Sequence, residues 1–160
     1  MSAENTLHAL LDKTTWTTAT LGEHLITIKG KKPKRLLQEP IAGALPYATA
    51  DYFRTCKASY FVPTDELGSC VRIQKGNLIM IWDGNAGEVF IGKEDSILAS
   101  TMALLSFKEP CLKTEFCYFF LQTSFNKLNQ FATGSVIPHV SKSVLTNLQL
   151  PLPPPKNSRN

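Results

Sequence analysis

The spacing of apolar residues changes at Pro110, and this change constrains the fold more than any other feature of the chain. Before Pro110, apolar residues fall in short runs separated by turn residues, which is typical of β-strands. The clearest run, residues 78–82, is entirely apolar and predicts a strand that is covered on both faces. After Pro110, large apolar residues recur every three or four positions up to Phe131, which predicts one long helix with a broad apolar face. The pattern therefore predicts an α+β protein.

Weaker signals predict the remaining elements. Ser141 is expected to cap a short helix that reaches Asn147, and Asp51 is expected to cap the turn after residue 49. The prolines from Pro151 onward are expected to end regular structure in a polyproline-like segment, while residues 1–13 carry a weak helical pattern. Strands or extended pieces are expected at residues 24–28, 46–49, 70–74, 88–91, 97–107 and 148–150.

The length and composition indicate an ordinary globular protein. A chain of 160 residues, of which 43% are hydrophobic and 19% charged, is expected to form one domain with a single core. We expect this domain to cover residues 1–155 and residues 156–160 to form a polar tail. No apolar run approaches the roughly 20 residues that span a bilayer, and residues 1–6 lack the basic start of a secretory signal. The protein is therefore expected in the cytoplasm, without membrane contact.

Positive charge is gathered into two blocks of sequence that contain no acidic residue. All 13 acidic residues lie outside residues 24–38 and 116–160. The two blocks can form one positive face that attracts a phosphate backbone, although a solvated surface loop is the alternative for either block. The basic residues of the two blocks are Lys29, Lys31, Lys32, Lys34 and Arg35, then Lys127, Lys142, Lys156 and Arg159.

The motifs of several enzyme classes are missing from the sequence. The turn at residues 83–87 lacks the Gly-x-Gly-x-x-Gly spacing of a nucleotide-binding loop and leads into a strand instead of a helix. Neither a Gly-Lys-Ser/Thr motif nor the Asp/Asn-Pro-Pro-aromatic motif of an amino-methyltransferase occurs. Ser135 and His139 lie close in sequence, but this is weak evidence for a hydrolase, because such a pair needs an orienting third group. The sequence thus predicts no catalytic site.

The cysteines and histidines do not form a zinc motif. The 4 cysteines are scattered without a Cys-x-x-Cys pair, and the 3 histidines do not complete a ligand set. We therefore expect neither a metal nor a cofactor.

Residues 131–142 carry the strongest binding signal. This segment joins the predicted helix to the Pro-rich end and holds no acidic residue. Gly134 permits a turn with positive φ, and Ser135 adds a hydroxyl and an open backbone N–H, so the two residues either contact phosphate or fix the loop. His139 either donates to a phosphate or base or packs as a structural residue. Of His139 and Lys142, Lys142 is the better candidate for a phosphate contact.

Two other segments offer candidate nucleic-acid contacts. Lys31, Lys32, Lys34 and Arg35 lie in the first basic block, where phosphate contact is the natural role. The amide of Asn85 has the groups that read adenine bidentately, but Asn is also an ordinary turn residue, and the turn role is favoured. The phenylalanines of the predicted helix are assigned to the core instead of base stacking, because their spacing is helical.

Five separated segments of the sequence match one family pattern in the same order. They are Trp16 with Leu21-Gly22-Glu23 and the basic loop that follows, residues 43–51, residues 75–89, residues 118–121 with the Ala-Thr-Gly-Ser stretch, and residues 144–154. Together they cover residues 16–155. They resemble target-recognition domains, the DNA-reading halves of the specificity subunit in type I restriction–modification systems.

The resemblance implies a protein without catalytic activity of its own. In this family one such domain reads one half of a split DNA site and positions the base for a partner methyltransferase subunit, and the same assembly can recruit a translocating nuclease subunit. The family usually continues after the prolines with an acidic Glu-Gln sequence that opens a long connecting helix, whereas residues 156–160 here are Lys-Asn-Ser-Arg-Asn. The resemblance therefore implies a half-subunit, a truncated gene or an excised domain, in which residues 156–160 start a shortened or missing connecting helix.

The expected protein is thus an α+β domain of the target-recognition type, with a curved, mostly antiparallel sheet and one major helix. We expect it to recognise duplex DNA in a sequence-specific manner, together with the methyltransferase (modification) subunit and, through the complex, the restriction nuclease subunit. The alternative is a truncated specificity-subunit remnant that binds the methyltransferase without useful DNA binding. The expected DNA-binding residues are Lys31, Lys32, Lys34, Arg35, Asn85, Gly134, Ser135, His139 and Lys142.

Overall fold

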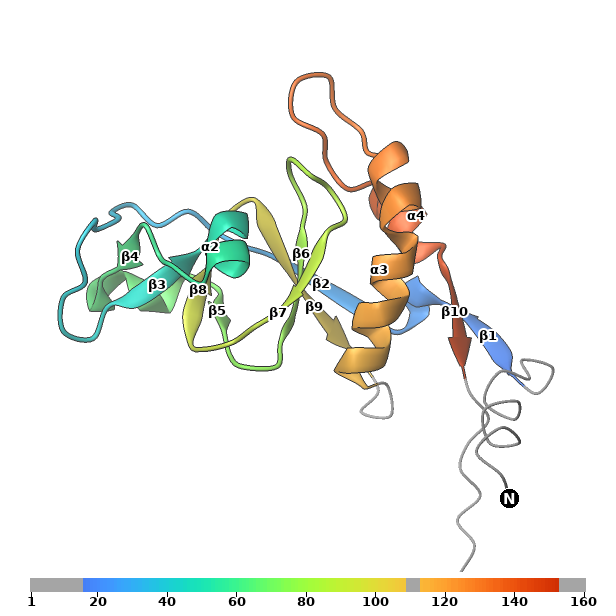
Figure 1. Ribbon diagram of the computed structural model, residues 1–160, viewed down its shortest axis with the longest axis horizontal. Helices are drawn as coiled ribbons and strands as arrows, with labels where there is room; N and C mark the ends of the chain where they lie inside the picture. The colour runs from blue at the N-terminus through green and yellow to red at the C-terminus, as the bar shows by residue number, and fades with distance from the viewer. Residues whose placement is uncertain (1–15, 109–112, 153–160) are drawn as a thin grey trace, which may run out of the picture.

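The computed structural model describes residues 16–108 and 113–152 (Figure 1). The weak helical pattern at residues 1–13 and the polar tail at residues 156–160 lie outside the described residues. Strands come first in the described chain, and the long helix, a short helix and a final strand follow, which confirms the predicted α+β class.

The described strands form three sheets, in which every strand pair except β3 with β8 is antiparallel. The mostly antiparallel pairing is therefore confirmed, although the strands are divided among sheets instead of forming one. The central sheet has the order β2 (Leu25–Lys29), β9 (Met102–Phe107), β6 (Leu78–Ile81) and β7 (Val89–Ile91). The second sheet has the order β4 (Phe61–Val62), β3 (Leu45–Ala48), β8 (Ser96–Leu98) and β5 (Arg72–Ile73), and the third pairs β1 (Thr17–Thr20) with β10 (Gln149–Leu152).

Strand β6 is an inner strand of the central sheet and contributes to two cores, so the expectation of a single core is wrong. All of its residues are buried, as the apolar run predicts. Leu78 and Met80 pack with helix α3 (Thr114–Gln130) in the helix-side core, whereas Ile79 and Ile81 pack with the second sheet in the sheet-side core. This alternation follows from the two-residue period of a strand. The helix-side core also includes Leu21, Val89, Cys117, Leu121, Leu128 and Leu145, and the sheet-side core also includes Val62, Ile73, Ile97, Leu98 and Met102.

Helix α3 confirms the long helix that the apolar spacing predicts. Its buried residues Cys117, Leu121 and Leu128 recur at helical intervals on one face. This face covers the central sheet on the side opposite the second sheet (Figure 1). Helix α3 therefore fixes where the loop that follows it leaves the body of the protein.

Short helical segments connect the strands. Helix α4 (Lys142–Thr146) begins after Ser141, whose Oγ accepts a hydrogen bond from the Val144 N–H at 3.4 Å, so the predicted cap is confirmed. The other short helical segments are α2 (Ala50–Thr55), η2 (Leu21–Glu23) and η3 (Thr64–Ser69).

Two local predictions are wrong for reasons of context. The cap of α2 is Thr49, whose Oγ1 accepts a hydrogen bond from the Tyr52 N–H at 3.3 Å, so Asp51 lies inside the first turn and is not the cap. Pro151 does not end regular structure, because it lies within β10 opposite Thr18. A strand at the edge of a sheet tolerates proline, since alternate N–H groups there have no partner in the ladder.

Candidate nucleic-acid interface

Three segments of the chain meet at the carboxylate of Asp83, the second residue after the end of β6. Its Oδ2 accepts a hydrogen bond from Nζ of Lys29, the last residue of β2, at 2.6 Å. Its Oδ1 lies 2.5 Å from Nδ1 of His139, in the loop between α3 and α4. One carboxylate therefore joins three segments: the start of the loop after β2 that carries Lys31, Lys32, Lys34 and Arg35, here named the first basic loop, the β6–β7 hairpin and the α3–α4 loop. Figure 1 shows the hairpin and the α3–α4 loop projecting on the same side of the molecule.

The α3–α4 loop, here named the 131–140 loop, is held at its base by backbone hydrogen bonds. Thr133 and His139 exchange N–H···O bonds of 2.9 and 2.6 Å, which close a short two-stranded ribbon. The Gly84 N–H donates to the Pro138 carbonyl, and the Val140 N–H donates to the carbonyl of Trp82, both at 2.8 Å. The base of the loop is therefore fixed to the hairpin, while residues 134–139 remain exposed.

The turn of this loop depends on Gly134. Its φ is +112°, and a Cβ at this position would lie 2.5 Å from the Ile137 carbonyl oxygen. A side chain is excluded on both grounds. The sequence prediction of a turn with positive φ at Gly134 is confirmed.

The charge of Asp83 is balanced by its two partners. Burial raises the pKa of Asp83, but the hydrogen bonds from Lys29 and His139 outweigh this effect and hold its pKa below the usual range. An ionised carboxylate only accepts hydrogen bonds, so Nδ1 of His139 carries the proton in this contact. The His139 side chain is half exposed, and its Nε2 makes no hydrogen bond within the described residues, so this nitrogen is open to an external partner.

The first basic loop runs from the Asp83 cluster to η3. The Lys34 N–H donates to Oε2 of Glu66 at 2.6 Å, and the Arg35 guanidinium forms an exposed ion pair with Asp65 at 3.0 Å. Such exposed pairs contribute about 0–1 kcal/mol, so Arg35 can exchange Asp65 for a phosphate at little cost. The side chains of Lys31 and Lys32 are exposed and make no ion pair with other residues in the described part of the chain.

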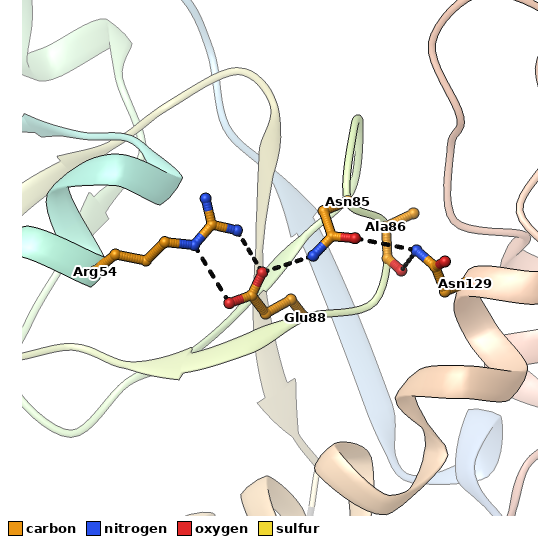
Figure 2. A network of polar contacts seen from close by, with 5 residues as sticks. All are labelled: Arg54, Asn85, Ala86, Glu88 and Asn129. Atoms are coloured by element: carbon orange, nitrogen blue, oxygen red, sulfur yellow. Dashed lines mark hydrogen bonds and ion pairs between the residues drawn. The ribbon is translucent and has the colours of Figure 1, made fainter.

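Asn85 lies in the hairpin, and both polar groups of its side chain have internal partners (Figure 2). Its Nδ2 donates to Oε2 of Glu88 at 2.9 Å, and its Oδ1 accepts from Nδ2 of Asn129 at 3.4 Å. Asn129 also donates to the Ala86 carbonyl at 3.2 Å, and Arg54 forms an ion pair with Glu88. This Arg54–Asn129 network joins α2, the hairpin and α3, so it favours the turn role of Asn85 over adenine reading.

The remaining candidates lie in or next to the 131–140 loop. Ser135 is exposed, and Lys142 is exposed at the first position of α4. Asp83 is an orienting group for His139 that the sequence did not reveal. However, among the described residues Ser135 makes no hydrogen bond with His139, so the contact between nucleophile and base that a hydrolase needs is missing.

Lys29 and Asp83 are the residues of this site that sequence reasoning did not select. Asp83 bonds both Lys29, which is 54 positions away in the sequence, and His139, which is 56 positions away. An acidic residue between an apolar strand and a glycine has the pattern of an ordinary turn. The pairing of β2, β9 and β6 brings Lys29 close to Asp83, and an isolated bridge between Asp83 and His139 adds the third residue.

Two further properties of the described residues concern ligands and membranes. No group of three or more His, Cys, Asp or Glu side chains in residues 16–108 and 113–152 is arranged to hold a metal ion. No helix in the same ranges is long and apolar enough to cross a membrane.

Comparison with known families identifies the type of domain. The model of the type I restriction modification DNA specificity domain family matches residues 13–159. The chain belongs to this family. It is 34% identical over 149 residues to the type I restriction enzyme MjaVIII specificity subunit of Methanocaldococcus jannaschii, which covers 92% of this chain and 34% of the relative. The chain therefore spans about a third of the length of this curated specificity subunit.

Three solved structures share the fold of this chain. The S subunit of a type I restriction-modification system from M. genitalium superposes with a TM-score of 0.63 at 20% identity, over 86% of this chain and 34% of that chain. The HsdS subunit of Thermoanaerobacter tengcongensis superposes with a TM-score of 0.62 at 18% identity, over 88% of this chain and 34% of that chain. A chain from a structure of type I R-M complex assembly superposes with a TM-score of 0.68 at 16% identity, over 94% of this chain and 40% of that chain. These similarities confirm the fold expected of a target-recognition domain.

Proposed function

We propose that this type I specificity domain binds duplex DNA in a sequence-specific manner, reads one half of a split target site, and performs no catalysis itself. The observation that carries the proposal is the meeting of the first basic loop, the β6–β7 hairpin and the 131–140 loop at Asp83. Segments that are distant in sequence are held there as one surface. The acidic group in this surface, Asp83, is already paired with Lys29 and His139. Membership of the DNA specificity domain family supports the same role.

The proposed contacts divide into phosphate contacts and supporting residues. Lys31, Lys32 and Lys142 are exposed cations suited to phosphate. Lys34 and Arg35 add charge at the far end of the first basic loop, where Arg35 exchanges its exposed partner. The backbone of the 131–140 loop offers further donors.

In the 131–140 loop, Gly134 shapes the turn and Ser135 presents a free hydroxyl and N–H to phosphate. His139 donates to DNA through Nε2 when its ring is protonated. Asn85 acts on the hairpin through its network with Glu88 and Asn129, so we assign it an indirect role.

Membership of the family supports a proposal about the partners. We propose that residues 1–155 act as one target-recognition domain that positions DNA for a methyltransferase subunit, and through the complex for a restriction nuclease subunit. Because the chain spans about a third of the curated specificity subunit, a second recognition domain on the same or another chain completes the split site.

A second candidate function is binding to the methyltransferase subunit without useful DNA binding. One observation favours it: Phe119 on α3 is 63% exposed and packs edge-to-face against Tyr118, which lines a shallow groove between α3 and β7. An exposed aromatic beside a groove is a common feature of protein interfaces.

The salt dependence of DNA binding tests the proposed function. Duplexes enriched from a randomised pool by the whole chain at low salt are expected to share a short half-site. The double variant Lys31→Ala/Lys32→Ala is expected to bind this half-site more weakly. It should also lower the slope of log affinity against log salt by up to about 1.8, at about 0.9 for each phosphate that the variant no longer neutralises.

Lys75→Ala is the matched control for this measurement. Lys75 is an exposed lysine in the turn before β6, at the end of that strand opposite Asp83, so its replacement should leave the slope unchanged. If a folded chain enriches no duplex, with or without the methyltransferase subunit, DNA reading is excluded and the interaction remnant takes its place.

A further inference from the structure

The outermost part of the 131–140 loop is apolar and exposed. Val136 is 89% exposed and Ile137 is 54% exposed, whereas Val140, after the base of the loop, is buried. Single exposed apolar residues are normal on protein surfaces. The 131–140 loop projects from the body of the protein (Figure 1). Two adjacent β-branched residues between the bridged Thr133 and His139 form a small apolar tip of this loop, here named the 136–137 tip.

The tip is held in place before any partner binds. The backbone bonds between Thr133 and His139 close the ribbon directly below it, and the Gly84 N–H holds the Pro138 carbonyl. Proline fixes φ at position 138. A rigid loop loses little conformational entropy on binding, which favours a role in recognition.

The charges around the tip indicate a polyanionic partner. Residues 116–160 contain no acidic residue, and the carboxylate at the base of the loop, Asp83, is paired with Lys29 and His139. The exposed Lys142 follows the loop. An apolar tip in a positive setting suits a ligand that combines phosphates with apolar groups, as the grooves of DNA do.

We propose that Val136 and Ile137 enter the major groove and pack against the C5-methyl group of thymine, so that the 136–137 tip selects thymine at one position of the half-site. The thymine methyl is the apolar group that base-pair edges present in the major groove, and that groove admits a two-stranded ribbon. The inference rests on the proposed DNA binding and specifies which residues read a base.

Replacement of thymine by uracil tests the inference, because it removes only the methyl group. With the selected half-site, each thymine is exchanged in turn and binding of the whole chain is measured. At least one exchange is expected to weaken binding about fourfold, from about 0.8 kcal/mol for one buried methyl. Val136→Ala and Ile137→Ala are expected to weaken binding to the thymine duplex, and at that position the variants should no longer distinguish uracil from thymine.

Ile41→Ala is the matched control, because Ile41 is 56% exposed and lies in the turn before β3. Its thymine–uracil difference should equal that of the unchanged chain. Both tip residues are exposed, so far-UV circular dichroism should not change in any variant.

The outcomes separate this inference from the proposed function. A selected half-site in which every uracil exchange is neutral, or in which the difference persists in both tip variants, overturns the inference alone. A second result also overturns the inference: binding raises the fluorescence of 2-aminopurine at a flanking base step, Val136→Ala abolishes this rise, and no uracil exchange weakens binding. This result would indicate that the tip acts as a wedge between bases. Failure to select any half-site overturns both proposals.

Discussion

The carboxylate of Asp83 contacts both Lys29 and His139 in the proposed interface, so Asp83→Asn is the most informative substitution in the site. The amide keeps the shape of the side chain but carries no charge. It therefore loses the ion pair with Lys29 and offers His139 a neutral acceptor instead of a carboxylate. We expect the free energy of unfolding to fall by about 1–2 kcal/mol at pH 7, because hydrogen bonds to a charged group are removed from a mostly buried site. Urea unfolding measures the change.

The pH dependence of this effect has a definite sign. The pKa of Asp83 is lower in the folded state than its ordinary value of 3.8, so its contribution to stability is present above the unfolded pKa. The contribution is lost as the pH falls through the folded pKa, below 3.8. The stability difference between the unchanged chain and Asp83→Asn should therefore disappear in acid.

Asp65→Asn is the control for Asp83→Asn. Asp65 pairs with Arg35, but its side chain is 65% exposed, so its replacement should change stability by no more than about 0.5 kcal/mol. Equal losses of stability for the two variants would contradict the structural role assigned to Asp83.

The β6–β7 hairpin is oriented by the Arg54–Asn129 network, and this predicts how Asn85 acts. Asn85→Ala and Asn129→Ala each remove part of the same set of hydrogen bonds, so we expect each to lower the free energy of unfolding by about 0.5–1.5 kcal/mol. The double variant should lose less than the sum, since one interaction is removed twice. Unfolding and DNA affinity are both measured for the complete double-mutant cycle.

The alternative role of Asn85 gives a different result. An asparagine that reads adenine would, on replacement, relax base preference at one position of the half-site, and Asn129→Ala would leave this preference intact. Equal loss of affinity for all sequences in both single variants is the result that the network predicts.

The elements were predictable from the sequence where one local pattern decides the structure. The apolar run of β6 and the helical spacing in α3 each specify both the element and its buried face, and Ser141 caps α4 by contacts within four residues. Where the local pattern allows two structures, the sequence predicted the wrong one. Thr49 and Asp51 are both able to cap α2, and Pro151 is allowed in β10 only because of its position in a two-stranded sheet.

The candidate site was predictable as loops but not as a cluster. The positive-φ turn at Gly134 and the charge of the first basic loop are local features of the sequence. The contact of Asp83 with Lys29 and His139 depends on strand pairing over long sequence separations. Internal partners such as those of Asn85 are likewise invisible without the fold.

Across the whole molecule, β6 couples the two cores, and this predicts one cooperative unfolding transition. Met80 and Ile79 are adjacent, fully buried, and belong to the helix-side and sheet-side cores respectively. Met80→Ala and Ile79→Ala are each expected to cost about 2–5 kcal/mol. Because both cores share one strand, each variant should shift the whole transition.

Tryptophan fluorescence and far-UV circular dichroism, followed through urea unfolding, test this coupling. Trp82 packs against the helix-side core, and the Trp16 ring centroid lies 6.4 Å from that of Phe116 in α3, so fluorescence reports on that side, whereas circular dichroism reports on the entire backbone. In a single cooperative unit the two signals coincide in both variants. If Ile79→Ala leaves the fluorescence transition in place while shifting circular dichroism, the cores unfold separately and the chain is not one domain. A coincident shift would mean that the strands and the helix that carry the hairpin and the 131–140 loop unfold as one unit.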